Sequence, residues 1–273
     1  MQVKHLKKEI KAIGPLPENI RVNPIVGDSF EVLDDILSSF KGNEQLAPSF
    51  VFCDPFGFTI PGAILRRLME FPRVELFVNI IWRELDMAIR QGTNMAEGMK
   101  NRLDLIFDNK NWLDCINSDD LDERADQCAD LFCEVAGARW ATHFRMLGKN
   151  QKTRYFLLHL TNHSAGRDLM KECMWKVCPD GGFYARKTDD PRQQFLITPE
   201  PDLEPLKKWI IEKLSHGTIR WKKLHVLVRH ELWLEKHVNE AVRELQKASV
   251  IVGENYEKRF AAVNNPLLRL TDN

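Results

Sequence analysis

The residues best suited to chemistry lie in the segment Asp54-Pro55-Phe56-Gly57, directly after the apolar run Phe50–Cys53. The apolar run predicts a buried strand, and the segment that follows predicts a sharp turn at the carboxyl end of that strand. In open α/β sheets, ligands bind just beyond such strand ends. We therefore expect this turn to border a ligand site.

The chemistry that this turn could support is methylation of an amine. Asp54 and the carbonyl of Pro55 can each accept one N–H bond, which would aim the nitrogen lone pair at a methyl donor. The ring of Phe56 or of Phe58 can stack on a planar base. We predict Asp54, Pro55 and Phe56 as catalytic residues, although Asp-Pro-x-Gly is also a common turn in which the aspartate caps its own corner.

Two further polar residues occur at or within predicted strands. Asp28 follows the strand predicted for 20–26, where a carboxylate could accept a bond from the adenine amino group of a cofactor. The alternative is that Asp28 caps the helix after it. Asn79 lies inside the apolar strand predicted for 74–82, where it either lines the crevice or satisfies a neighbouring backbone group.

Basic residues gather near the end of the chain and could contact the phosphates of a nucleic acid. Several glutamates are interleaved with them, so the alternative is a solvated surface or a protein-docking surface. The predicted nucleic-acid-binding residues are Arg220, Lys222, Lys223, Arg243, Lys247, Lys258 and Arg259.

Metal chemistry is not predicted. His230-Glu231 has leucine at position 234, so the H-E-x-x-H spacing of metalloproteases is absent. The six cysteines include no C-x-x-C pair, which predicts reduced, structural thiols. The one tight group of carboxylates, at positions 119, 120 and 122, is typical of the start of a helix.

The elements that must position these residues alternate between strands and helices. Such alternation predicts an α/β fold with a parallel sheet. After a basic helix at 4–13, the pattern predicts strands at 20–26, 50–53 and 74–82, and helices at 30–40, 60–70 and 83–91.

The middle of the chain follows a different pattern. Helical stretches from about 95 to 136 precede two strands, 140–147 and 155–160, whose short connection makes them antiparallel. A helix at 165–177 and a short strand at 193–197 complete this part. Parallel strands followed by an antiparallel hairpin are similar to the sixth and seventh strands of class I methyltransferase sheets.

A linker rich in proline at 199–202 predicts the boundary between a domain of residues 1–200 and a small domain of residues 201–273. The small domain is predicted to contain a helix from Leu203, helices at 219–232 and 235–248, and strands at 250–252 and 267–270. Three helices followed by a β-hairpin are the plan of a winged helix.

Composition sets further limits. The chain has 273 residues, 44% of them apolar and 29% charged, with no net charge. Residues 201–273 are mildly basic, with 13 Lys and Arg against 10 Asp and Glu, a weak indication of an anionic partner. The apolar stretches are far shorter than the ~20 residues of a membrane span, and no secretory signal is recognisable. We expect a cytoplasmic protein that contacts no membrane.

The assembled pattern resembles the three-Cys-motif partner (TcmP) family. The matching elements are Gly27-Asp28, the Asp-Pro-Phe-Gly turn with the strand before it, Leu76-Phe77-Val78-Asn79-Ile80, Tyr155-Phe156-Leu157-Leu158 and Met174-Trp175. The resemblance implies a Rossmann-like class I methyltransferase fold with a C-terminal winged helix. It also implies a role beside a three-Cys-motif protein and, in an intact homologue, S-adenosylmethionine as cofactor.

One departure from the family concerns the cofactor. Class I methyltransferases hold S-adenosylmethionine chiefly through a Gly-rich turn after their first strand, and this sequence contains no G-x-G. The first strands of the sheet are therefore expected to be missing, and the chain is expected not to bind this cofactor appreciably. Whether it is an enzyme stays open, and the alternative is a non-catalytic module that binds nucleic acid or protein through the winged helix.

Overall fold

The computed structural model describes residues 2–41, 44–148, 151–181, 183–186, 199–254 and 264–271. The chain divides into two compact units, residues 1–45 and 46–273. It is an α/β protein with a mixed five-stranded sheet, so the predicted class is confirmed at this level. In the part of the chain described, none of the helices has both the length and the apolar character needed to cross a membrane.

The first unit contains helices α1 (Gln2–Ile13) and α2 (Ser29–Ser39), both at predicted positions. The strand predicted for residues 20–26 is wrong, since this stretch forms no strand. Its apolar side chains remain exposed, with 59% of Ile25 and 77% of Val26 accessible to solvent. A strand needs a neighbour for its backbone hydrogen bonds, and Pro24 has no N–H to donate.

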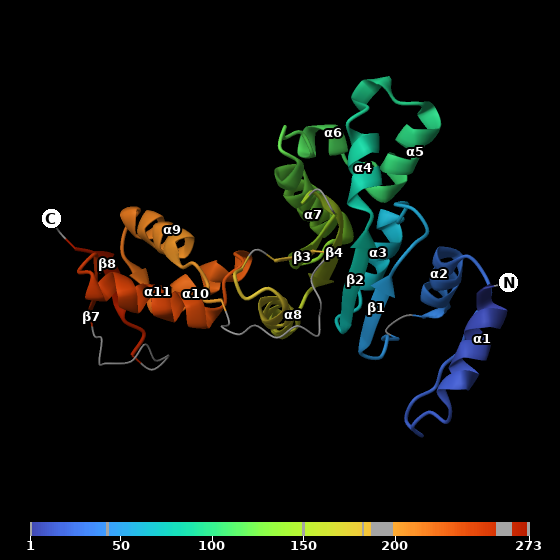
Figure 1. Ribbon diagram of the computed structural model, residues 1–273, viewed down its shortest axis with the longest axis horizontal. Helices are drawn as coiled ribbons and strands as arrows, with labels where there is room; N and C mark the ends of the chain where they lie inside the picture. Colours follow the sequence, from blue (N-terminus) through green and yellow to red (C-terminus); the bar gives the residue numbers. More distant parts are fainter. Residues whose placement is uncertain are drawn as a thin grey trace. The chain divides into compact units, whose positions relative to one another are not determined.

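The second unit is built on a sheet with the strand order β1-β2-β4-β3-β5. Figure 1 labels the first four strands of this order. β1 and β2 are parallel and joined through α3 (Gly62–Met69), whereas β3 and β4 form the predicted antiparallel hairpin. β4 is also antiparallel to β2, and β5 is parallel to β3. The bounds are β1 Ser49–Cys53, β2 Val74–Ile80, β3 Trp140–Leu147, β4 Thr153–Thr161 and β5 Tyr184–Arg186. The strand predicted for 193–197 lies outside the described residues.

One face of the sheet carries the main apolar core. Leu76, Val78 and Ile80 of β2 are almost fully buried on this face. Helix α3 packs against β2 and α7 (Leu121–Ala136), while α4 (Trp82–Ile89) packs against β4. Smaller helices lie between α4 and α7 in the sequence: η1 (Gly92–Asn94), α5 (Glu97–Ile106) and α6 (Trp112–Cys115).

A buried ion pair joins α4 to α7 within this core. Arg124 Nε donates to Asp86 Oδ1 at 2.7 Å, and both residues are about 95% buried. The guanidinium also donates to the carbonyls of Ser118 and Asp119, at 2.8 and 2.9 Å. Asp120 caps α7 by accepting from two backbone N–H groups, which confirms the helix-capping interpretation of this acidic cluster.

Helix α8 (Ser164–Val177) packs against β3 and β4, and its apolar residues meet the start of a C-terminal module. Met174 and Trp175 of α8 are buried with Phe144 of β3, Phe183 and Leu234 in one apolar cluster.

In its described residues, the C-terminal module has three α-helices, one 3-10 helix and a three-stranded antiparallel sheet of order β6-β8-β7. Its elements are α9 (Glu204–Ser215), β6 (Ile219–Arg220), α10 (Trp221–Leu227), η2 (Val228–His230), α11 (Glu235–Lys247), β7 (Ile251–Glu254) and β8 (Leu267–Leu270). The helix predicted for 219–232 is thus too long, because residues 219 and 220 pair with β8 instead of joining the helix.

Three side chains of α8 bind the loop that leads into α11. Arg167 and Lys171 donate to the carbonyls of Arg229 and Glu231 respectively, and Trp175 Nε1 donates to the Leu232 carbonyl at 3.0 Å. These three residues are spaced four apart, so they lie on one face of α8. That face therefore anchors the C-terminal module to the sheet.

Candidate functional site

Asp54 lies at the carboxyl end of β1, beside Asn79 of β2. The register pairs Cys53 with Val78, so the next residue of each strand is Asp54 and Asn79. Asn79 Nδ2 donates to Asp54 Oδ1 at 2.7 Å. The Asn79 side chain thus forms a hydrogen bond with the Asp54 side chain and not with a neighbouring backbone group. This bond holds the exposed Asp54 carboxylate in place at the strand end.

The turn after Asp54 presents an aromatic ring to solvent. Phe56 is 91% exposed, whereas Pro55 and Phe58 are half-buried. Gly57 has φ of +82°, a conformation that strains any residue with a Cβ. The Phe56 ring has no contact with another aromatic ring of the described residues.

Sequence reasoning missed an aromatic surface beside Asp54. Phe50 and Phe52 of β1 are 61% and 54% exposed, although the sequence predicted a buried strand here. Their rings lie 5.9 and 6.0 Å from that of Phe77 on β2, measured between centroids. Because side chains alternate along a strand, Phe50, Phe52 and Asp54 share one face. The alternation at positions 50, 52 and 54 was the signal that could have revealed this surface.

A buried polar cluster lies farther along the same face of the sheet. Glu75 Oε2 is 2.7 Å from His159 Nε2, and Thr161 Oγ1 donates to Glu75 Oε1 at 2.8 Å. Burial lowers the pKa of His159, and the adjacent carboxylate opposes that shift. A Cβ on Gly166 of α8 would lie 2.2 Å from the Glu75 carboxylate, so any larger residue at position 166 would clash with this carboxylate. His159 and Thr161 are buried, and 26% of the Glu75 side chain is exposed. The cluster joins β2, β4 and α8, which indicates a structural role.

Asp28 lies in the first unit, where it caps α2. Its Oδ1 atom accepts from the backbone N–H groups of Phe30 and Glu31, at 2.9 and 3.2 Å. The capping interpretation is therefore confirmed. The predicted contact of Asp28 with an adenine stays a prediction.

The predicted nucleic-acid-binding residues of the C-terminal module lie at its surface. Lys222 and Lys223 follow Trp221 in the first turn of α10, and Arg243 and Lys247 are one turn apart on α11; all four are exposed. None of them forms an ion pair with another described residue. Arg220 is also exposed, and its Nη1 donates to the carbonyl of Asn265 at 3.3 Å. Lys258 and Arg259 lie outside the described residues.

None of the six cysteines, all of which lie within the described residues, forms a disulfide, as predicted. Burial raises the pKa of Cys53 and of Cys133 to about 11, and that of Cys128 is raised as well. These three thiols therefore stay protonated at neutral pH. Across the described ranges, no three His, Cys, Asp or Glu side chains come together in a way that could hold a metal ion.

Comparison of the chain with protein-family models, with curated proteins and with solved structures finds no match.

Proposed function

We propose that this chain is a TcmP-like protein built on part of a class I methyltransferase sheet, with a winged helix at its C-terminus. The strand arrangement supports the first part. β1 and β2 are parallel, and β3 and β4 then form an antiparallel hairpin, as the resemblance to methyltransferase sheets predicts. The succession α9-β6-α10-α11-β7-β8 supports the second part, since it supplies three helices and a β-hairpin. Family resemblance also suggests a three-Cys-motif protein as the partner.

Within this fold, we assign to Asp54 the task of orienting the amino group of a methyl acceptor. The observation that carries this assignment is the 2.7 Å hydrogen bond from Asn79 to Asp54 at the end of β1. It uses Oδ1 and leaves Oδ2 to accept an N–H bond from the acceptor amine. The carbonyl of Pro55 would take the second N–H, and the exposed ring of Phe56 would cover a planar base.

The residues present do not fit S-adenosylmethionine. The sequence has no G-x-G turn, residues 20–26 form no strand, and Asp28 Oδ1 is already engaged by two backbone N–H groups. The proposal therefore concerns only the acceptor side of a methyltransferase-like site.

The acceptor proposal predicts selective binding of adenosine over inosine, which lacks the exocyclic amino group. Titrating both nucleosides into labelled protein should shift the Asn79 side-chain amide resonances with adenosine. Asp54→Asn should weaken adenosine binding about tenfold or more, because a hydrogen bond to a charged group is lost.

Asp35→Asn is the matched control, since it removes one exposed carboxylate from α2 and should leave adenosine binding unchanged. Equal binding of inosine, or an Asp54→Asn variant that binds like the wild type, would contradict the proposed role of Asp54.

A second candidate function is nucleic-acid binding by the C-terminal module. Lys222 and Lys223 are exposed at the start of α10 and are not engaged in ion pairs with described residues. Glutamates of the same module are partly neutralised, since Glu235 lies 3.8 Å from the guanidinium nitrogen Nη2 of Arg229. Glu244 is paired similarly with Lys207 at 2.5 Å.

If this second function holds, the full chain should bind a short DNA duplex with an affinity that falls steeply with salt. Replacing Lys222 and Lys223 by glutamine should reduce the slope of log K against log salt concentration by about two, one for each lost phosphate contact. Lys7 and Lys8 of α1 provide a control pair with the same change of charge. Absence of binding at low salt, or an equal effect of the control pair, would rule out this interface.

A further inference from the structure

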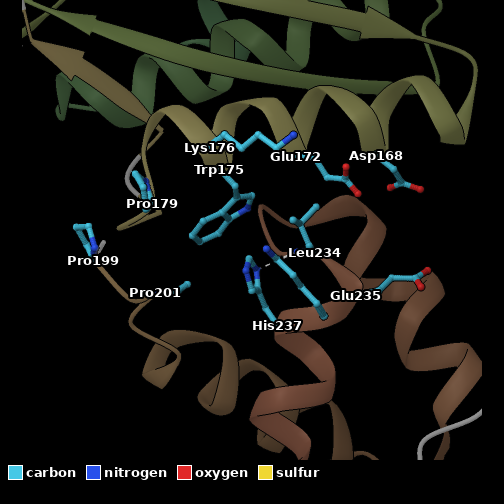
Figure 2. A pocket seen from close by; sticks show the side chains of 11 residues that line it. Asp168, Glu172, Trp175, Lys176, Pro179, Pro199, Pro201, Leu234, Glu235 and His237 are labelled. Atoms are coloured by element: carbon cyan, nitrogen blue, oxygen red, sulfur yellow. Dashed lines mark hydrogen bonds between the residues drawn. The ribbon is translucent and has the colours of Figure 1, made fainter. Parts of the chain in front are cut away.

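A pocket of about 770 Å³ lies between α8 and the start of α11 (Figure 2). Its volume falls within the range of small-molecule sites. The apolar part of its lining consists of Trp175, Leu234, Pro179, Pro199 and Pro201. Figure 2 shows the Trp175 indole beneath α8, facing His237 at the start of α11. The pocket is separate from Asp54 and from the basic residues assigned above.

His237 contributes a hydrogen-bond donor to this pocket. The residue is 3% exposed, and its Nδ1 accepts from the backbone N–H of Leu234 at 3.3 Å. Burial lowers the pKa of His237 to about 4, with a smaller contribution from Lys236, so the ring is neutral at pH 7. Because Nδ1 is the acceptor, the proton lies on Nε2. No described residue accepts from this Nε2.

The first turn of α11 contributes two further donors. Leu234 occupies the N-cap position and has no side-chain oxygen to cap the helix. The backbone N–H groups of Glu235 and Lys236 consequently have no acceptor among the described residues. In the segment before α11, the backbone carbonyls of Glu231 and Leu232 accept hydrogen bonds from Lys171 and Trp175 of α8.

The charges around the pocket are compatible with the binding of an anion. Lys176 and Lys236 are exposed at the pocket and form no ion pair with a described residue. Of the three acidic residues that line it, Asp168 is paired with Arg167, and Glu235 lies near His225 and Arg229. Glu172 is then the one acidic side chain of the described lining without a basic partner.

We propose that this pocket binds a small organic carboxylate with a planar or apolar body. The carboxylate accepts from His237 Nε2–H and from the free N–H groups at the start of α11, while the body lies against Trp175 and the prolines. A helix N-terminus and a neutral imidazole both donate hydrogen bonds to an anion, and the apolar side chains of the lining favour an organic body over a bare inorganic ion.

The test compares phenylacetate with phenylacetamide, a neutral probe of the same size, titrated into the full-length labelled protein. Phenylacetate should shift the amide resonances of Glu235 and Lys236 and the Trp175 indole resonance, and these shifts should saturate. Phenylacetamide should bind about tenfold more weakly or worse, as expected when hydrogen bonds to a charged group are lost.

Two variants probe the two kinds of donor. His237→Phe keeps the ring volume but removes Nε2–H, and Leu234→Asn introduces a side-chain cap that engages the free N–H groups at similar volume. Each should weaken phenylacetate binding about tenfold. His216→Phe, at an exposed position after α9, is the matched control and should bind like the wild type.

Equal binding of the two probes, or no saturable shift at about 20 mM phenylacetate, a concentration far above the useful range of a specific site, would overturn the proposal. The proposal would also be overturned if the folded Leu234→Asn variant bound phenylacetate as tightly as the wild type does. This second variant keeps the proposal testable if His237→Phe does not fold.

Discussion

Replacing Arg124 by alanine is expected to lower the free energy of unfolding by about 3–5 kcal/mol. The substitution leaves the carboxylate of Asp86 buried, at 5% exposure, without its ion-pair partner. It also removes donors from the carbonyls of Ser118 and Asp119. For a unit of this size, the thermal midpoint should fall by roughly 10 °C, measured by calorimetry or circular dichroism.

Two controls separate the buried charge from a general loss of salt bridges. Lys100→Ala removes an exposed i,i+4 pair with Asp104 and should cost only about 0.5 kcal/mol. The double variant Asp86→Leu/Arg124→Met removes both buried charges and should recover most of the lost stability. A cost for Arg124→Ala as small as that for Lys100→Ala would show that Asp86 is not desolvated.

The sequence predicted the second unit well because its elements have strong, regular patterns. β2 alternates buried and half-buried residues over its whole length, and the β3–β4 hairpin has a short polar connection. Asp120 occupies a typical N-cap position, and the structure bears this out. These structures depend mainly on residues close together in the sequence, so they can be predicted without knowing the rest of the fold.

The prediction failed where partners distant in sequence decide the structure. Residues 20–26 have the composition of a strand, but no neighbouring strand accepts their hydrogen bonds. Residues 219 and 220 continue a helical pattern, yet they pair with β8, more than 40 residues away. The full burial expected for Phe50 and Phe52 likewise depended on elements that could not be inferred from these residues.

The candidate site was predictable in part for the same reason. The position of Asp54 at a strand end could be predicted from the apolar run before it. Its hydrogen bond with Asn79 could not, because that bond depends on the register of β1 with β2. The pocket beside His237 was not predictable, because α8 and α11 lie far apart in the sequence. The neutral, donating state of His237 follows from its burial and from its bond with the Leu234 backbone, and neither can be inferred from the sequence.

Replacing Trp175 by alanine is expected to lower the free energy of unfolding by about 3–5 kcal/mol, the usual cost of removing a buried aromatic side chain. The indole is 5% exposed, and its ring centroid lies 4.3 Å from that of His237 and 5.6 Å from that of Trp233. The substitution also leaves the Leu232 carbonyl without the donor that it has from Nε1.

Trp175→Phe provides the matched variant, because it keeps a ring in the apolar cluster and loses chiefly the Nε1–H bond. Its cost should be about 1–2 kcal/mol. Hydrogen exchange locates the effect: amides of residues 228–234 should lose protection in Trp175→Ala, whereas those of β1 and β2 should keep it. Equal costs for the two variants, or an equal loss of protection in β1 and β2, would mean that the Trp175 indole does not help to hold the C-terminal module against α8.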